Sequence, residues 1–322
     1  MDFLGQRMPY VTAFSKALGT GMMISADSPI GDESRSAMES LIEDYEHVLS
    51  RFRNDSLIAA IGKAEHGGSF DFPDWCAPLF DLYDALFSAT SDAIDPCVGE
   101  DLIRLGYDAS LSFTVTQDAP EHLGALRGRA VWGRDVTRHG TTLVTHEPVQ
   151  LDFGACGKGY LVDLLGRMLQ SSQFVIDAGG DLLIHAEQPI SIALEDPEDS
   201  SRAIGVAHIV NGALCASAPS RRHWNVAVNE RTQIAIHHLL NAIDGLPAQQ
   251  TEASWAYVPA NATPDIARDY PAAVADGLAT ALFVSDATQL QRTFDFAYAT
   301  LNESRQIAAS RNFPAELFLR SA

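Results

Sequence analysis

The sequence predicts an α+β fold, organised as a single domain over residues 1–322 with a mixed, largely antiparallel sheet and packed helices. Amphipathic helices come early in the chain, while strand-like segments dominate its middle. The two kinds of element do not alternate regularly, as they do in a doubly wound parallel sheet. No internal repeat or low-complexity linker divides the 322 residues. A chain of this length can bury one large core, so one domain is expected rather than two.

Four segments have the apolar spacing or composition of helices. The strongest runs from Ser34 to Phe52 after a serine-rich start, and a second lies around Pro78–Ser88. A third opens at about Lys158 and extends to Leu169. The fourth is Val274–Leu282, which is rich in alanine. These patterns predict helices that bury at least one face.

Short segments with β-branched or alternating residues predict strands. The expected strands are Thr141–Phe153, Phe174–Asp177, Ile190–Leu194, Val206–Ala216, Gln233–Leu240 and Glu252–Val258. Two polar stretches, Glu195–Arg202 and Pro259–Tyr270, are expected to form long surface loops.

The charge balance excludes some classes of partner. Lys and Arg number 22 and Asp and Glu number 42, which gives a formal net charge of −20. Such an acidic chain is a poor ligand for nucleic acid or an anionic membrane. If the ligand is itself an anion, its site must supply positive charge locally.

The cysteines and the N-terminal segment indicate a cytoplasmic protein. The four cysteines are far apart and form no CxxC pair, so reduced, mostly buried thiols are expected rather than zinc or a redox dithiol; they are Cys76, Cys97, Cys156 and Cys215. Charged residues interrupt the N-terminal segment, and it has no early cysteine that could carry a lipid, so neither a signal peptide nor an anchor is expected. No apolar run is long enough to span a membrane.

Asp276 and Thr280 lie four positions apart on the expected alanine-rich helix, so they share one face. A carboxylate and a hydroxyl are hard oxygen ligands, and their small neighbours let a bulky group approach the backbone. This combination suits Mg²⁺ carrying a phosphate. A helix rich in Ala and Gly is also typical of a tightly packed core, so the pair alone leaves both interpretations open.

The segment Leu151–Asp163 predicts an anion site. A strand is expected to end there, a glycine-rich turn follows, and a helix begins near Lys158, so free N–H groups, the helix dipole and an ammonium converge. Gly159 follows the lysine, so the segment is not a Walker loop, and an NTPase is disfavoured. The alternative is a glycine-rich turn that only lets a strand and a helix pack.

A second glycine turn and a pair of histidines are further candidates. Gly179 and Gly180 follow an expected strand, where they permit close approach of a ligand or form an ordinary hairpin. His237 and His238 are neighbours in an expected strand and would point to opposite faces. Only one histidine can then face a site, and a structural role is expected for His237.

Seven segments in order resemble motifs of the ApbE family, the FAD:protein FMN transferases. They are Leu18–Thr20, Ser50–Ser56, Ile94–Gly99, Asp152–Asp163, Gly179–Asp181, His238–Pro247 and Ala275–Leu282. Two departures stand out. Cys97 replaces a usual Thr, and the stretch after His238 lacks the Asp, Pro, Arg and Thr of the family pattern HIIDPRTG, although Gly245 and Pro247 are kept. The resemblance implies an ApbE fold, similar to the T-fold.

The resemblance also implies a site. Asp276, Thr280 and the carbonyl of Ala155 would hold Mg²⁺, which bridges the pyrophosphate of FAD, while Lys158 neutralises phosphate charge. His238 is the candidate general base. The other positions that the family pattern places on the dinucleotide are Leu18 and Phe52, which would pack against its rings, Asp95 and Asp152, which would bond its polar groups, and Ala93, Ile94, Gly179, Gly180 and Ser217.

The implied reaction is Mg²⁺-dependent transfer of the FMN moiety of FAD to a Ser or Thr hydroxyl of an acceptor protein, with AMP released. The family's acceptor motif, Asp followed three positions later by Ser or Thr, then Gly, Ala and Ser or Thr, does not occur here. A partner protein would therefore be modified in trans. Two alternatives stay open: an FAD pyrophosphatase that gives FMN and AMP, and a non-catalytic flavin-binding protein.

Overall fold

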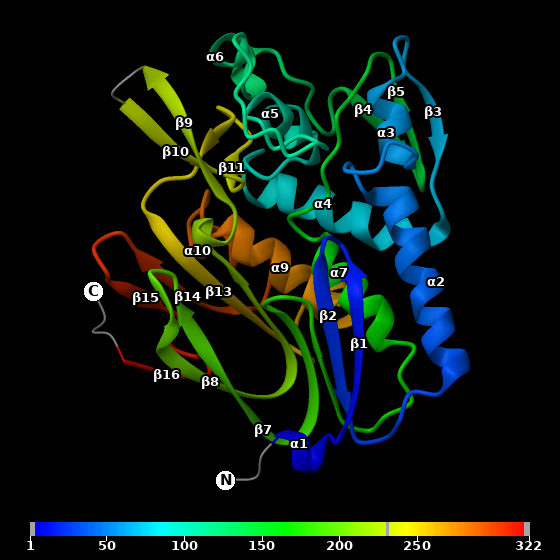
Figure 1. Ribbon diagram of the computed structural model, residues 1–322, viewed down its shortest axis with the longest axis vertical. Helices are drawn as coiled ribbons and strands as arrows, with labels where there is room; N and C mark the ends of the chain where they lie inside the picture. The colour runs from blue at the N-terminus through cyan, green and yellow to red at the C-terminus, as the bar shows by residue number, and fades with distance from the viewer. Residues whose placement is uncertain (1–3, 230–231, 319–322) are drawn as a thin grey trace.

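The main sheet has nine strands and organises the whole molecule (Figure 1). A computed structural model describes residues 4–229 and 232–318, and side chains are described outside 226–234. Along the sheet the order is β1 (Tyr10–Ala17), β2 (Thr20–Ala26), β6 (Phe174–Asp177), β7 (Asp181–Asp196), β8 (Asp199–Ser217), β13 (Thr251–Pro259), β14 (Ala297–Asn302) and β15 (Ile307–Ala309), with β16 (Ala315–Leu317) on β8. Each of these pairings is antiparallel, and the α+β expectation is confirmed.

Three small sheets stand apart from the main one. They are β3 (Gly68–Asp71) with β5 (Thr142–Thr145) and β4 (Val136–His139); β9 (His223–Asn229) with β10 (Thr232–His237); and β11 (Leu240–Asn241) with β12 (Leu246–Pro247). The β9–β10 hairpin extends from the body of the molecule beside α5 (Gly99–Arg104) and α6 (Ala119–His122) (Figure 1).

Four helices carry most of the helical core, and their existence was predicted from sequence. They are α2 (Asp32–Leu49), α4 (Ala77–Ala89), α7 (Gly157–Gly166) and α9 (Pro271–Ala281). The shorter helices are α1 (Leu4–Arg7), α3 (Leu57–Gly62), α8 (Asp265–Asp269) and α10 (Ala287–Leu290). None of the helices in residues 4–229 and 232–318 is long and apolar enough to cross a membrane.

Helices α7 and α9 pack closely because both carry small residues at their contact. A Cβ on Gly159 would lie 2.1 Å from the carbonyl oxygen of Ala272, so only glycine fits there. The buried carboxylate of Asp163 accepts hydrogen bonds from the backbone N–H groups of Ala272 (3.1 Å) and Ala273 (2.8 Å). These bonds satisfy donors that the first turn of a helix leaves free. The N-terminus of α9 is thereby fixed onto α7.

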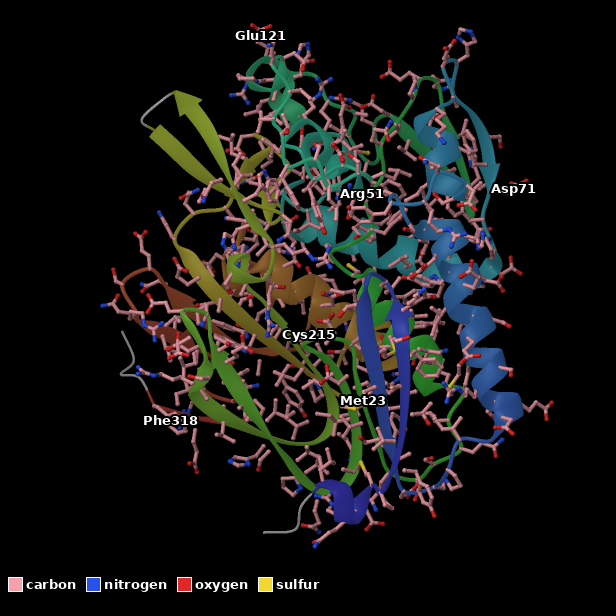
Figure 2. All side chains as sticks on the ribbon, in the orientation of Figure 1. Met23, Arg51, Asp71, Glu121, Cys215 and Phe318 are labelled. Carbon is pink, nitrogen blue, oxygen red and sulfur yellow. The ribbon has the colours of Figure 1, made fainter. Side chains whose placement is uncertain are left out.

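The side chains labelled in Figure 2 include buried and exposed positions. Cys215 lies inside, and all four cysteines are buried and free, as expected. Arg51 is one of the charged residues with a buried side chain, which is only 7% exposed. In contrast, Asp71 and Glu121 lie at the periphery (Figure 2).

The polar stretch Glu195–Arg202 is not a loop, so that prediction was wrong. Strand β7 continues to Asp196 and β8 begins at Asp199, and Glu195 pairs with Ala203 across the hairpin. Hydrogen bonding along a hairpin uses backbone groups, so exposed polar side chains do not end it. The second expected loop, Pro259–Tyr270, contains the short helix α8.

Two expected strands end earlier than predicted. From the segment Thr141–Phe153 only Thr142–Thr145 forms a strand. The apolar residues of its second half are buried, but that half belongs to no sheet. Strand β10 ends at His237, and His238 lies in a bend, so the argument that strand geometry points the two histidines to opposite faces does not hold. The pairs β1–β2 and β14–β15 were not predicted.

Candidate functional site at helices α7 and α9

Three charged side chains from distant segments meet at the start of α7. The ammonium of Lys158 lies 2.5 Å from Oδ2 of Asp181, on β7, and 3.1 Å from Oδ1 of Asp276, on α9. The other oxygen of Asp276 accepts the backbone N–H of Gly159 at 3.0 Å. Both carboxylates are buried, whereas 32% of the lysine side chain is exposed. The lysine thus forms the open side of the cluster.

The electrostatics of the cluster favour an added cation. Burial, and then the neighbouring charge of Asp181, raise the pKa of Asp276 to about 7 despite Lys158 and the N–H of Gly159. Burial opposes the charge of Lys158, but Asp181 and Asp276 outweigh burial and raise its pKa. Oδ1 of Asp181 is buried without a hydrogen-bond partner. One ammonium therefore faces two carboxylates, and one carboxylate oxygen still lacks a donor or a cation.

The oxygen donors present suit Mg²⁺ that is bound partly by water and substrate phosphates. They do not suit a metal ion whose ligands all come from the protein. No group of three or more His, Cys, Asp or Glu side chains within the described part of the chain could hold a metal ion. Asp276 and Thr280 nevertheless share a face of α9, and Thr280 is the only residue of α9 that is not buried. Mg²⁺ is usually held by one or two carboxylates with water and substrate phosphates. The unpartnered oxygen of Asp181 supports such a site.

The turn before α7 is tied to the turn that follows α2. Asp152 accepts the backbone N–H of Gly154 at 2.6 Å through one oxygen and pairs with Nε of Arg51 through the other. The Ala155 carbonyl lies in this turn, between Gly154 and the first residue of α7. Both oxygens of Asp152 are engaged by the chain itself. Its expected contact with the dinucleotide stays a prediction.

The second glycine turn joins β6 to β7 and faces the β1–β2 hairpin. Gly179 and Gly180 have φ of 72° and 110° and donate their N–H groups to Asp177. A Cβ on Gly180 would meet nothing within 4 Å, while one on Gly179 would lie 3.1 Å from the hydroxyl of Thr20. The turn thus closes a hairpin and also leaves open space beside Gly180. Ser217 ends β8, which pairs with β7 beyond this turn.

Leu18 is half-buried in the β1–β2 turn beside α2, and Phe52 is exposed in the turn that follows α2. Leu18 has φ of 53°, and its N–H donates to Glu46 at 2.8 Å. The Phe52 side chain is 39% exposed and meets the ring of Tyr107 edge-on, with 5.4 Å between centroids. Their predicted packing against a ligand's rings remains untested, but both are placed where a ligand could reach them.

His238 is half-buried in the bend after β10, and one of its ring nitrogens is left as an acceptor. Its Nδ1 lies 3.2 Å from the carbonyl oxygen of Arg222. A carbonyl only accepts, so Nδ1 carries the proton and Nε2 is left as an acceptor. Burial, with Arg222, His237 and Lys158 nearby, lowers its pKa to about 4. His237 is instead buried, with Nε2 3.0 Å from the carbonyl oxygen of Ala248.

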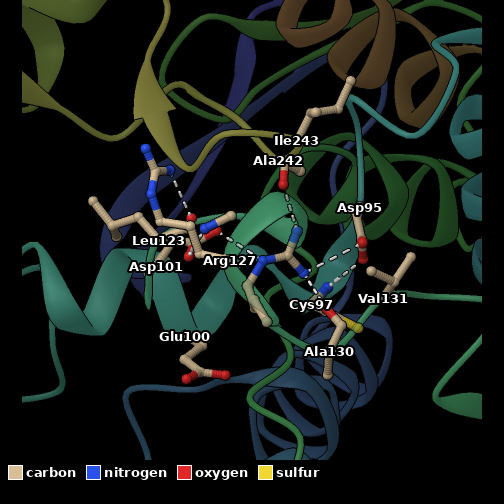
Figure 3. A network of polar contacts seen from close by, with 12 residues as sticks. Asp95, Cys97, Glu100, Asp101, Leu123, Arg127, Ala130, Val131, Ala242 and Ile243 are labelled. Carbon is tan, nitrogen blue, oxygen red and sulfur yellow. Dashed lines mark hydrogen bonds and ion pairs between the residues drawn. The ribbon is translucent and has the colours of Figure 1, made fainter. Parts of the chain in front are cut away.

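Asp95 lies inside a buried ion network that also holds the stretch after His238 (Figure 3). Asp95 caps the turn at Cys97 and pairs with Arg129 at 3.3 Å, and Asp101 lies 2.8 Å from the same guanidinium. Arg129 also donates to the carbonyl oxygen of Ala242 at 2.7 Å. The N–H of Ala242 bonds to the carbonyl oxygen of Ala93, next to Ile94, at 3.1 Å. The stretch that departs from the family pattern is therefore held through its backbone.

Three charged residues of this region were missed at the level of sequence. Asp181 closes the Gly-Gly-Asp motif and was therefore within reach of motif reasoning. Arg51 lies in the Ser50–Ser56 segment, but its pairing with Asp152 crosses 101 positions. Arg222 lies outside all seven segments.

The conserved profile of the ApbE family matches residues 18–300. The chain belongs to the ApbE family. A similar curated protein is the FAD:protein FMN transferase of Treponema pallidum (strain Nichols), which is 26% identical over 274 residues, covering 76% of this chain and 69% of that protein.

Solved ApbE structures have the same fold as this ApbE-family chain. The crystal structure of the ApbE protein from Thermotoga maritima matches with a TM-score of 0.77 at 20% identity, over 95% of this chain and 99% of that one. The flavin transferase ApbE from Vibrio cholerae matches with a TM-score of 0.73 at 17% identity, over 94% and 97% of the two chains. At these identities the likeness concerns the fold alone.

Proposed function

We propose that this ApbE-family chain is an FAD:protein FMN transferase, which moves the FMN moiety of FAD onto a Ser or Thr hydroxyl of an acceptor protein and releases AMP. The observation that carries the proposal is the cluster of Lys158, Asp181 and Asp276. It joins three family motifs at a point where a buried carboxylate oxygen lacks a partner. The Treponema pallidum relative, named for this activity, supports the same reaction.

Asp276, Thr280 and the Ala155 carbonyl are the proposed ligands of Mg²⁺. When bound, Mg²⁺ supplies Lewis-acid polarisation of the FAD pyrophosphate. Lys158 would bind a pyrophosphate oxygen, because its side chain is the exposed member of the cluster. The N–H groups at the start of α7 add the positive end of a helix dipole.

His238 would act as the general base. Its lowered pKa of about 4 keeps Nε2 unprotonated at neutral pH. Nε2 takes the proton of the acceptor hydroxyl while the hydroxyl oxygen forms a bond to the FMN phosphorus. The bond from that phosphorus to the bridging oxygen breaks, and AMP leaves with the electron pair. General-base assistance of this kind contributes roughly 10²–10⁴-fold to the rate.

Incubation with FAD, Mg²⁺ and an acceptor protein tests the proposal, with mass spectrometry of both the protein and the nucleotides. The expected result is an FMN adduct on Ser or Thr, AMP in equal amount, and loss of both with EDTA. Asp276→Ala should abolish transfer, while Asp265→Ala, at an exposed position of α8, should not. Free FMN with AMP but no adduct would instead identify a pyrophosphatase. Unchanged FAD would leave a flavin-binding protein.

A further inference from the structure

Two arginines converge on the ring of Tyr107. The guanidinium carbon of Arg51 lies 4.7 Å from the ring centroid, and that of Arg222 lies 5.8 Å from it. Arg51 also donates to the carbonyl oxygen of Tyr107 at 2.6 Å, and Arg222 bonds to its hydroxyl group. Two like charges so close together repel each other, and cation–π contacts offset this only partly.

The two arginines have one carboxylate partner between them in the described residues. Arg51 pairs with Asp152, but its Nη2 is buried without a hydrogen-bond partner. Arg222 forms no ion pair with any carboxylate in the described residues, although the chain carries a net charge of −20. Its neighbour Arg221 does pair, with Glu195 at 2.8 Å. Partial burial, and then the charge of Arg51, lower the pKa of Arg222.

This cationic pair lies beside His238. The carbonyl oxygen of Arg222 is 3.2 Å from Nδ1 of His238, and the rings of Tyr107 and His238 are 6.4 Å apart between centroids. Trp224 also stacks on Tyr107, with 5.8 Å between the ring centroids. A substrate group bound at the pair would therefore sit next to the proposed base.

We propose that Arg222 and Arg51 form an oxyanion-binding subsite over Tyr107, which takes a phosphate or carboxylate group of a substrate entering beside His238. Arg222 is exposed and would make the direct contact, while the buried Arg51 holds Tyr107 in place and adds positive charge. A guanidinium binds both kinds of oxyanion through paired N–H donors. The subsite is separate from the Lys158 cluster. That its oxyanion comes from FAD or from the acceptor protein rests on the proposed function; the presence of the subsite does not.

Calorimetry of the full chain tests the subsite without turnover, with inorganic pyrophosphate as the phosphate probe and N-acetylaspartate as the carboxylate probe. Arg222→Gln should weaken one probe by about tenfold, the loss expected for a charge-assisted hydrogen bond. Arg221→Gln is the matched control, because Arg221 is the adjacent arginine and has its own carboxylate partner. It should bind both probes like the unaltered chain.

Kinetics then assigns the source of the oxyanion. A raised KM for FAD in Arg222→Gln identifies a phosphate of the nucleotide, and a raised KM for the acceptor identifies an acidic group on that protein. If Arg222→Gln binds both probes and both substrates as tightly as the unaltered chain, the subsite does not exist, whether or not the chain transfers FMN. If probe binding depends on Arg222 but no FMN is transferred, the subsite stands and the proposed function fails.

Discussion

The ammonium of Lys158 lies 3.1 Å from a carboxylate oxygen of Asp276, although 118 positions separate the two residues. The contact exists because α7 and α9 approach each other at Gly159, whose N–H bonds to the same carboxylate. The helix packing and the chemistry of the site therefore depend on one glycine. The cluster should be lost if the helices are pushed apart.

Gly159→Ala should destabilise the protein and the site together. The added Cβ would lie 2.1 Å from the backbone oxygen of Ala272, and a backbone atom cannot rotate away. Overpacking of this kind costs about 1–3 kcal/mol. Gly157→Ala is the matched control on the same helix, because its Cβ would meet only the hydroxyl of Tyr45, at 3.4 Å. Urea unfolding of both variants measures the difference, and equal stabilities would contradict the close-packing argument.

Asp276→Asn and Lys158→Met should change the affinity for Mg²⁺ in opposite directions. The asparagine removes the charged ligand, so binding should weaken by at least about tenfold. The methionine removes an ammonium that competes for the same oxygens, so Mg²⁺ should bind more tightly in the absence of FAD. Calorimetry with MgCl₂ measures both. Unchanged affinity in Asp276→Asn would mean that the ion, if it binds, is held elsewhere.

Parts of this site were predictable from sequence because they are local. The shared face of Asp276 and Thr280 needs only the periodicity of one helix, and the position of Lys158 at the start of another needs only the glycine turn before it. Asp181 reaches the cluster because α7 packs against β7, which brings the Gly-Gly-Asp turn to the lysine. No local pattern contains that information.

The arginines over Tyr107 could not be predicted, because their contacts join segments 56 and 115 positions apart. The long hairpin of β7 and β8 was underestimated for a different reason. Its far end is polar and largely exposed, so its residues have the composition of a loop while their backbones pair. The composition of a segment reflects how exposed its side chains are to solvent. Strand pairing depends instead on whether a partner strand lies beside it.

The pH profile should reflect the lowered pKa of His238. An ordinary histidine, with a pKa of 6.5, would lose its base form below pH 6.5, but here the pKa is lowered to about 4. The rate of transfer should therefore stay level from pH 7 down to about 5, as far as the base is concerned. An acid limb near pH 6.5 that disappears in His238→Ala would show that the histidine is not shielded in this way.

The same shift has a consequence for stability. Between pH 6.5 and about 4 the unfolded chain binds a proton at His238 that the folded chain does not bind. The free energy of unfolding should therefore fall as the pH drops through this window. His238→Gln should reduce this loss, as measured by urea unfolding at pH 7 and pH 5. An identical pH dependence in the two proteins would contradict the lowered pKa.

Arg129→Leu should destabilise the protein, because it leaves two buried carboxylates, Asp95 and Asp101, without their cation. It should also displace the stretch after His238. Removing one partner of a buried ion pair costs about 3–5 kcal/mol. The bond to the Ala242 carbonyl is lost as well, so transfer should fall more than FAD binding does. Arg127→Leu is the matched control, since Arg127 is exposed and bonds only backbone carbonyls in the described residues. If both variants unfold at the same urea concentration, the ion network does not stabilise the stretch after His238.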